Sequence, residues 1–489
     1  MIMEKTNHKE YSHRFLARIV LEAETPLAVG SGEKDIRTDA LVATDSNGLP
    51  YIPATSIAGI LRSMSGLKDM DPLFGFQTGD GSHGSELIFT EAKVIDSKGN
   101  VIDGMNPSAI GKDPLLGHYQ LLPVRQHVRI DGKGTAADSA LFNEQVVFAG
   151  TRFCFEIEMV GDGPDFNRFE DVLRKIKAAD FRLGGGTRSG FGKIKVVGLK
   201  HLDLDLKVKS DLSVYLEKTS SLDGEFWNRH TGRLKKLSPG SEGNTSLVEY
   251  RLELEPEDFF LFGSGFSDDS ADMTPVKARK VDWSDSQGRM MENQVLIPGS
   301  SLKGALAHRV AFHFNRLEGV FADDLRKDEM QSVVAQRNSA VKALFGSEGT
   351  GKNNEGIRRG NVMVADIIEA PVPDKILNHV AIDRFTGGTI AGALFNEKAS
   401  YGKGRSYKTE IIIDEVGLKR ACELEWGKTG SEDKAKNLKK AFESALKDLC
   451  SGMLPLGGGV NRGHGVFNGI LEKLDNEGKW IRIFPTSNM

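Results

Sequence analysis

The chain has 489 residues, of which 39% are hydrophobic and 27% charged, and its formal net charge at pH 7 is −4. This composition indicates a globular protein of two to four domains, and it excludes a protein that coats nucleic acid through an overall basic excess. The polar start, residues 1–12, has no apolar signal region, and no apolar run approaches the roughly 18 to 20 residues that span a bilayer. We therefore expect a cytoplasmic protein without a membrane partner.

The three cysteines, Cys154, Cys422 and Cys450, lie far apart and form no CxxC pair. An odd number of widely spaced cysteines supports neither a disulfide framework nor a zinc site. We expect them to be buried, small apolar residues.

The predicted elements of the first half follow one another in a regular order. Residues 15–27 mix apolar and charged side chains in a strand-like pattern and end at a glycine turn. The phrase IPATSIAGIL (52–61) begins a helix, and residues 169–176 place apolar side chains at helical spacing. A glycine loop, LGGGTRSGFG (183–192), then leads into an apolar strand. Strand, helix, strands, helix, glycine loop and strand describe a ferredoxin-like βαββαβ unit.

Hydroxyl side chains follow the Ile-Pro pair that precedes the first helix in each half. They are Thr55 and Ser56 in the first half and Ser300 and Ser301 in the second. Because a hydroxyl oxygen can accept a hydrogen bond from a backbone N–H of the first helical turn, we predict that these residues act as N-caps.

The second half repeats the marks of the first half in the same order. The IPxxSxxGxL phrase returns at 297–306, the LGGGxxxGxG phrase returns at 456–465, and the pentapeptide ALFNE occurs at both 140–144 and 393–397. Ordered repeats of this kind indicate two copies of one unit. We therefore predict an α+β fold of two tandem ferredoxin-like (RRM-like) units.

The boundaries of the two units follow from composition. Residues 1–200 form the first unit and residues 245–489 form the second. The segment between them, 201–244, is polar and charged and contains a Ser-Pro-Gly-Ser turn. That composition is typical of a connector.

The glycine loops are candidate phosphate-binding elements. Their backbone amides can donate to phosphate oxygens without any side-chain charge, and a nearby Lys or Arg adds the counter-charge. The alternative is that the glycines only permit tight turns. The candidate RNA-binding residues on these grounds are Ser56, Arg62, Gly185, Arg188, Ser301, Lys303, Gly458 and Arg462.

Several of these motifs together resemble a known family. GLPYIPATSIAGILR (48–62), LIPGSSLKGAL (296–306), two Leu-Phe-Gly marks, the AIDR sequence at 381–384 and the two glycine loops look like the RAMP superfamily of CRISPR-associated proteins. More narrowly, they resemble the repeated backbone subunit of type III effector complexes. The resemblance implies a fusion of two such subunits, as in type III-D-like systems. Such a protein holds guide RNA beside other effector subunits and cleaves the paired, single-stranded target RNA.

The first copy departs from the family pattern at two positions. Ala54 and Ala58 stand where the family prefers Gly and Lys, whereas the second copy has Gly299 and Lys303. We therefore expect a weaker grip on RNA in the first copy, with Arg62 as the compensating charge.

The resemblance also implies which residues cut. In the family the cutting residue is an aspartate shortly after the first glycine turn, and the matching positions are Asp39 and Asp272. Each would place a divalent cation, Mg²⁺ or Mn²⁺, or the 2′-hydroxyl for in-line attack. One unit per six nucleotides, as the family implies, would give two cuts six nucleotides apart. Four further carboxylates are close enough in sequence to assist: Glu33, Asp35, Asp268 and Asp269.

Two segments rich in small residues, 132–140 and 385–393, resemble the thumb hairpin that the family inserts between guide and target. Such a hairpin displaces one base pair in each period of six. Arg129 and Arg384 would then contact the displaced nucleotides.

Two other functions stay open. The protein could be a structural RNA-binding backbone with silent aspartates. It could also be a metal-independent ribonuclease that processes guide RNA through His127 or His379, since a histidine can move a proton near neutral pH. Each histidine begins an HVxID strand, where hydrogen bonding is a sufficient explanation.

Overall fold

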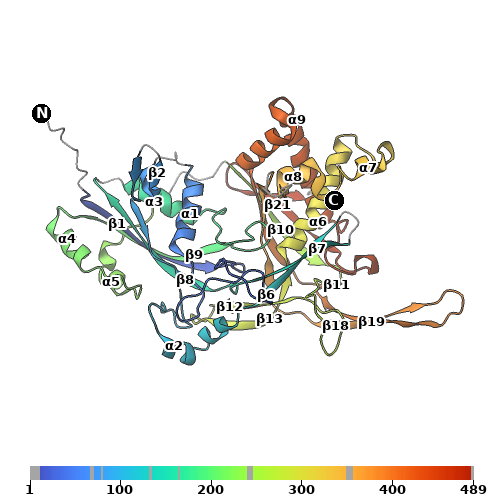
Figure 1. Ribbon diagram of the computed structural model, residues 1–489, viewed down its shortest axis with the longest axis horizontal. Coiled ribbons are helices and arrows are strands. Elements are labelled where there is room, and N and C mark those ends of the chain that lie inside the picture. Colours follow the sequence, from blue (N-terminus) through green and yellow to red (C-terminus); the bar gives the residue numbers. More distant parts are fainter. Residues whose placement is uncertain are drawn as a thin grey trace.

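A computed structural model of the protein describes residues 11–66, 71–78, 81–131, 135–163, 166–238, 246–348 and 356–485. The predicted α+β fold is confirmed, with strand and helix alternating in both halves (Figure 1). Across these ranges, no helix is long and apolar enough to cross a membrane. Cys154, Cys422 and Cys450 are free and buried, as predicted.

The first half contains a ferredoxin-like unit. Its elements are β1 (His13–Ala23), α1 (Ala54–Ser65), β4 (Leu87–Phe89), β5 (Lys93–Val94), β8 (Arg152–Gly161), α3 (Phe166–Ile176) and β9 (Ile194–Asp205). The antiparallel sheet has the order β4-β8-β1-β9, with β5 also paired to β8. The first strand is therefore central, between the third and the fourth, as the βαββαβ pattern requires. We call the part from β1 to β9 the first unit.

The second half repeats this topology. Its elements are β10 (Leu247–Pro256), α6 (Gly299–Leu317), β16 (Val362–Val364), β20 (Tyr407–Asp414), α9 (Glu415–Cys450), β21 (Phe467–Leu474) and β22 (Trp480–Phe484). The sheet order is β16-β20-β10-β21-β22, so β10 is central and β22 is an addition at the edge. Helix α9 is broken at Gly427, which has a φ of 73°. We call the part from β10 to β22 the second unit.

The remaining elements are short or lie in hairpins. They are β2 (Phe76–Thr78), β3 (Gly81–His83), α2 (Pro107–Lys112), α4 (Lys209–Leu216), α5 (Glu225–Arg229), β11 (Phe259–Phe260), α7 (Lys327–Met330), α8 (Ser339–Phe345), β14 (Gly346–Ser347), β15 (Arg358–Arg359) and β17 (Ile367–Glu369).

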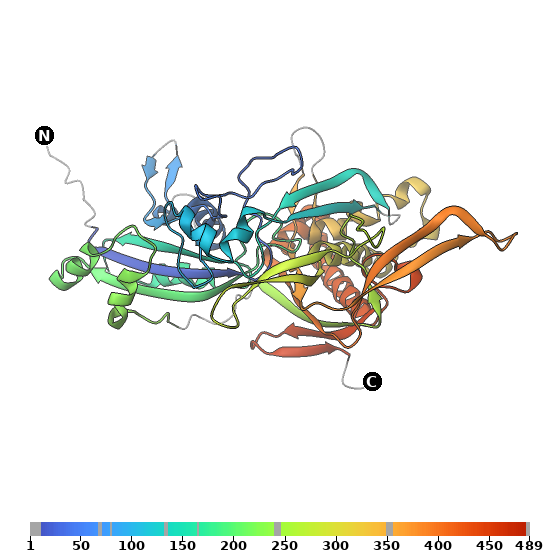
Figure 2. The ribbon, with the colours of Figure 1, turned by 90° about the horizontal axis from the view of Figure 1, so that it is seen from below.

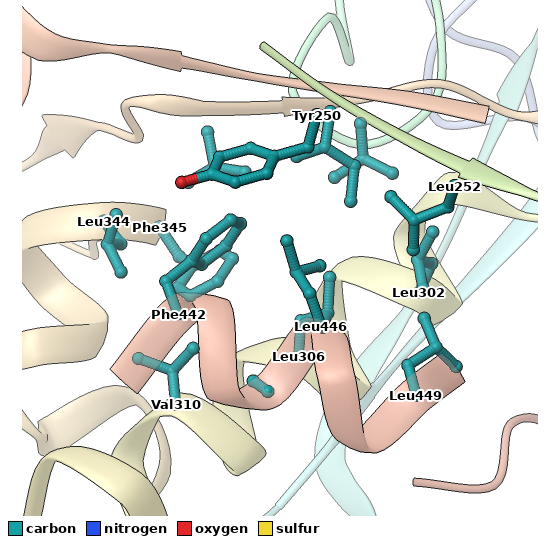
Figure 3. Close-up of a cluster of buried hydrophobic side chains, with 14 of the residues drawn as sticks. Tyr250, Leu252, Leu302, Leu306, Val310, Leu344, Phe345, Phe442, Leu446 and Leu449 are labelled. Atoms are coloured by element: carbon teal, nitrogen blue, oxygen red, sulfur yellow. The ribbon is translucent and has the colours of Figure 1, made fainter. Parts of the chain in front are cut away.

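Each sheet buries one face beneath two helices. On β10, Tyr250, Leu252 and Leu254 alternate with polar residues and face the core, because successive side chains point to opposite faces of a strand. Helix α6 meets them with Leu302 and Leu306, one helical turn apart, and α9 adds a further apolar stripe (Figure 3). Burial of each large apolar side chain contributes roughly 1.5–3 kcal/mol. The apolar pattern of the sequence therefore determines how the helices sit on the sheet.

The predicted hydroxyl N-caps are wrong. Helices α1 and α6 begin at Ala54 and Gly299, and Pro53 and Pro298 occupy the N-cap positions without a side-chain cap. The hydroxyl residues therefore lie inside the first turn, two or three residues after the N-cap position. At α6 the Gly299 backbone N–H donates instead to Asp366 Oδ1, at 2.7 Å.

A long hairpin is inserted in each unit at the predicted thumb position. In the first unit it consists of β6 (Val124–Ile130) and β7 (Ala136–Gln145), and part of its tip, 132–134, lies outside the described residues. In the second unit it consists of β18 (Asp374–Ile382) and β19 (Thr389–Tyr401). The β6–β7 hairpin lies beside the second unit, whereas β18–β19 projects away from the body (Figures 1 and 2).

The expected connector is folded over most of its length. Strand β9 continues to Asp205, past the expected boundary at 200, and α4 and α5 follow it. Val214, Phe226 and Trp227 from these helices pack on the outer face of the first sheet. Residues 239–244 of the expected connector lie outside the described residues.

The two units pack directly against each other. The hairpin of β12 (Lys277–Asp282) and β13 (Arg289–Ile297) leaves the second unit, and its Val281 joins the core of the first. The Val281 N–H donates to the Ala149 carbonyl at 2.8 Å. The Trp283 indole N–H donates to the Gly150 carbonyl, also at 2.8 Å. We call this contact region between the units the seam.

Candidate functional site

Asp39 lies in the loop between β1 and α1, where that loop meets β7. Its backbone N–H donates to Asn143 Oδ1 at 2.9 Å, and the Asn143 N–H donates in return to Asp39 Oδ2 at 2.9 Å. Asn143 Nδ2 also donates to the Arg37 carbonyl at 2.9 Å. Asp39 is exposed, and its Oδ1 has no hydrogen-bond partner among the described residues. The loop is thus fixed on the hairpin while one carboxylate oxygen faces outward.

Asp272 has the same arrangement in the second unit. Its N–H donates to Asn396 Oδ1 at 2.7 Å, and the Asn396 N–H donates to Asp272 Oδ2 at 2.9 Å. Asp272 is also exposed. The backbone of Met273 completes the docking, because it accepts a hydrogen bond from the Lys398 N–H at 2.8 Å. We call each reciprocal Asp–Asn pair a clamp.

The two clamp asparagines were not among the residues predicted from sequence. Asn143 and Asn396 are the fourth residues of the two identical ALFNE pentapeptides. That identity is the signal in the sequence, but by itself it indicates only that the two copies align. The role of the asparagine depends on a loop that lies 104 residues away in the first unit and 124 in the second.

The neighbouring carboxylates shape the loops. Asp35 Oδ1 accepts from the backbone N–H groups of Arg37 and Thr38 at 2.7 and 2.6 Å. Asp268 accepts from Lys398 Nζ at 2.5 Å and from Ser270, and the Lys398 hydrogen bond holds the Asp268 pKa well below its usual range. The carboxylates of Asp35 and Asp268 therefore already accept hydrogen bonds within the protein.

The donor set near each aspartate is small. In the ranges that the structure covers, no group of three or more His, Cys, Asp and Glu side chains could hold a metal ion. Mg²⁺ at phosphate-transfer sites is commonly held by one or two protein carboxylates together with water and substrate phosphates. Each clamp offers one free carboxylate oxygen, which fits a cation shared with RNA and does not fit a cation held by protein alone.

His127 lies on β6 and His379 on β18, the first strands of the two hairpins. His127 Nε2 is 3.1 Å from Glu144 Oε1, and its ring stacks on Phe142 with the centroids 4.7 Å apart. His379 Nε2 forms a 3.0 Å hydrogen bond with Glu397 Oε1. Each ring nitrogen Nε2 thus faces a carboxylate of its own chain.

The two final glycine loops are held tightly to the sheets. The amides of Gly185 and Gly458 donate to the carbonyls of Ala28 and Leu261, both at 2.7 Å, so these two donors are already used within the fold. At Gly465, φ is 75°, and a Cβ would lie 1.9 Å from the Leu456 carbonyl oxygen. Loop closure is therefore one sufficient reason for glycine there.

The seam brings together cations that the sequence placed on separate motifs. Lys303 Nζ, on α6, is 3.5 Å from Ser189 Oγ, and Arg188 Nε donates to the Gly360 carbonyl at 2.9 Å. Lys303, Arg188 and the neighbouring Arg359 have no carboxylate partner in the described part of the chain. Burial lowers the Lys303 pKa, and Arg188 adds to that effect. Burial, with Arg359 and Arg182 nearby, lowers the Arg188 pKa to about 10. An anion at this place would relieve the mutual repulsion of these groups.

The other predicted RNA-binding residues fall into three groups. Arg62 on α1 and Arg384 beside the β18–β19 tip are exposed, and within the described ranges neither is paired with a carboxylate. Arg129 forms hydrogen bonds of 2.7 and 2.6 Å to Glu348, and Arg462 donates to Glu397 at 2.6 Å. Ser56 and Ser301 lie in the first turns of α1 and α6.

The fold and the paired loops define a class: two tandem ferredoxin-like units, each with one clamped aspartate beside an inserted hairpin. The sequence profile of the RAMP superfamily matches residues 20–195 and 292–468. These stretches cover well over half of the chain, and the chain belongs to the RAMP superfamily. Membership implies a CRISPR-associated RNA-binding subunit. Asp39, Asn143 and Asn396 lie inside the matched stretches, and Asp272 lies before the second one. No curated protein matches the chain.

Proposed function

We propose that the protein is a backbone subunit of a type III CRISPR effector complex that binds guide RNA and cuts the paired target RNA. Asp39 and Asp272 carry the cutting, one in each unit. The observation that carries this proposal is the clamp itself, because the same Asp–Asn reciprocal bonds occur at equivalent positions beside both hairpins.

The clamp suits a reaction that depends on position. In the cut, the target 2′-hydroxyl oxygen would bond to the adjacent phosphorus and pass its proton to solvent. The P–O5′ bond would break and O5′ would take a proton from solvent, which leaves a 2′,3′-cyclic phosphate and a 5′-hydroxyl. Such in-line attack gains most of its rate from alignment of the reacting atoms. The free Oδ1 of Asp39 or Asp272 would hold Mg²⁺ or Mn²⁺, which supplies charge neutralisation at the phosphate. The asparagine fixes the direction in which that oxygen points.

The unpaired cations suit the RNA backbone. Arg188, Lys303 and Arg359 at the seam, together with exposed Arg62 and Arg384, offer positive charge to phosphates on a chain whose net charge is −4. Two units with one aspartate each agree with two cuts, and the resemblance to type III backbone subunits implies a spacing of six nucleotides. The other subunits of the effector complex are the expected protein partners.

The test uses the full-length chain assembled with guide RNA and its partner subunits. The double variant D39A/D272A is expected to bind guide and target RNA like the wild type and to cut neither place, and EDTA is expected to stop the wild type. The matched control is D162A, because Asp162 is exposed and lies away from both clamps. Unchanged cutting by the double variant would show that the aspartates were wrongly assigned.

A wild-type complex that binds target RNA in Mg²⁺ without cutting it would identify a structural backbone subunit instead. Metal-independent cutting of repeat RNA by the isolated chain would favour the guide-processing alternative. That alternative has less support, because the Nε2 atoms of His127 and His379 face Glu144 and Glu397.

A further inference from the structure

A buried carboxylate lies directly behind the clamp of the second unit. Glu397 follows Asn396 on β19, so the two side chains point to opposite faces of the strand. Asn396 faces Asp272, and the Glu397 side chain is 0% exposed. Contacts that fix Glu397 therefore also fix Asn396, the neighbouring residue of β19 to which Asp272 is hydrogen-bonded.

Three cationic or titratable side chains converge on Glu397. Arg462 donates to Oε2 at 2.6 Å, His379 Nε2 lies 3.0 Å from Oε1, and His464 Nδ1 lies 3.5 Å from Oε1. Arg462 and His464 come from the final glycine loop, and His379 comes from β18. The Arg462 guanidinium also lies over the Phe395 ring, 5.6 Å from its centroid. The carboxylate thus connects the glycine loop and both strands of the hairpin at one point.

The first unit supports the same strand differently. Glu144 occupies the position of Glu397, and its one ion pair among the described residues is with His127, at 3.1 Å. The glycine loops align without a gap, so Ser189 stands at the position of Arg462 and Phe191 at that of His464. Phe191 is 1% exposed and presents its edge to His127, with the ring centroids 5.7 Å apart. The first unit therefore has no arginine–carboxylate pair here: the Phe191 ring packs on His127, and the Arg125 guanidinium lies over that ring, 5.5 Å from its centroid.

A fully buried carboxylate tolerates the loss of its main cation poorly, because the remaining charge is left without compensation. The segment that carries it then relaxes toward water or toward another partner. At Glu397 this movement would shift Asn396, and with it the free oxygen of Asp272.

We propose that Arg462 and Glu397 form a positioning pair for the cutting site of the second unit. The pair fixes Asp272 through Asn396, and the first unit has no arginine at the corresponding position. This inference rests on the proposed cutting function. It assigns Arg462 a role inside the protein in place of the direct RNA contact expected from the sequence.

The test reads both cuts on one labelled target RNA, so that each molecule carries its own control. In the full-length chain assembled with guide RNA, R462M is expected to slow the cut that depends on Asp272 by about 10- to 100-fold, in line with the cost of a small misplacement. The Asp39-dependent cut and the affinity for guide RNA are expected to stay unchanged. R462K, which restores a cation, is expected to recover part of the lost rate.

The matched control is R229M. Arg229 pairs with Glu217 at the surface, with side chains 55% and 42% exposed, and such pairs contribute little. If R462M does not fold, the nearly isosteric E397Q replaces it and must slow the Asp272-dependent cut alone.

Three results would overturn the positioning pair. They are an Asp272-dependent cut that is as fast in R462M as in the wild type, equal slowing of both cuts, and weaker guide binding, which would make Arg462 an RNA ligand. A failure of the proposed cutting function would give a different result. In that case the wild type cuts nowhere, or D272A leaves the second cut in place.

Discussion

The two units hold their aspartates with the same hydrogen bonds and surround them with different chemistry. Behind the clamp, the first unit packs Phe191 against His127, whereas the second unit neutralises a buried Glu397 with Arg462. Their first helices also differ, since Ala58 stands where the second unit has Lys303. Different supports around an identical clamp agree with the proposal that cutting depends on the clamp.

The hairpins extend this contrast. In the first unit, the hairpin is tied to the second unit, because Arg125 donates to Asp366 at 2.6 Å and Arg129 pairs with Glu348. In the second unit, the β18–β19 hairpin projects from the body (Figure 2). The inserted hairpin thus occurs in two arrangements within one chain. The first hairpin is docked on the second unit, and the second hairpin projects from the body. A further subunit placed beyond the second unit would find that hairpin available.

The largest expected effect comes from removing the clamp, which both units share. N143A and N396A should each slow the cut of their own unit by about 10²-fold, because the aspartate loses the side chain that receives its backbone N–H. Rates of both cuts on one target RNA provide the measurement, with N476A, in the exposed β21–β22 turn, as the control. If one asparagine variant slowed both cuts equally, the clamps would not act separately.

The second expected effect concerns the seam. Gly299, which corresponds to Ala54 of the first unit, packs so closely that a Cβ would lie 2.7 Å from Gly190 Cα. G299A should therefore destabilise the chain by roughly 1–3 kcal/mol, the usual cost of overpacking. A Cβ at Gly304, on the same helix, would meet nothing within 4 Å, so G304A should be neutral or stabilising by up to about 1 kcal/mol. Thermal unfolding compares the two, and equal melting temperatures would contradict a tight seam.

The smallest expected effect tests the charge difference between the first helices. K303A gives the second unit the residue of the first, and it should lower guide-RNA affinity and reduce the slope of log affinity against log salt by about 1. Titration at several salt concentrations measures this change, and A58K should move both quantities in the opposite direction. An unchanged slope of log affinity against log salt would show that Lys303 does not belong to the RNA-binding surface.

Lys303 should strengthen RNA binding but destabilise the RNA-free folded chain. Its pKa is lowered in the fold, so below the ordinary lysine pKa the unfolded chain binds more protons than the folded one. Stability of the RNA-free wild type should therefore rise with pH between the lowered and the ordinary pKa. K303A should lack this rise and melt slightly higher at neutral pH.

Much of the fold could be predicted because its signals are local. The apolar spacing of residues 169–176 and its repeat in α9 place buried faces that the structure confirms. The helices α4 and α5 were not predicted, because their short apolar clusters around Val214 and Trp227 lie in a polar, charged segment. These clusters become core only against the outer face of the first sheet. The candidate site also has a part that local sequence predicts and a part that it does not. The aspartates follow from motif position, whereas the clamp asparagines and the meeting of Arg188 with Lys303 depend on contacts between distant segments.

The most direct test of the account is a map of the cuts made in a guide-paired target RNA by the assembled wild type, D39A and D272A. The account predicts two cuts six nucleotides apart in the wild type, loss of one cut in D39A and loss of the other in D272A. A map in which either variant keeps both cuts, or in which one substitution removes both, would contradict the assignment of one cutting aspartate to each unit.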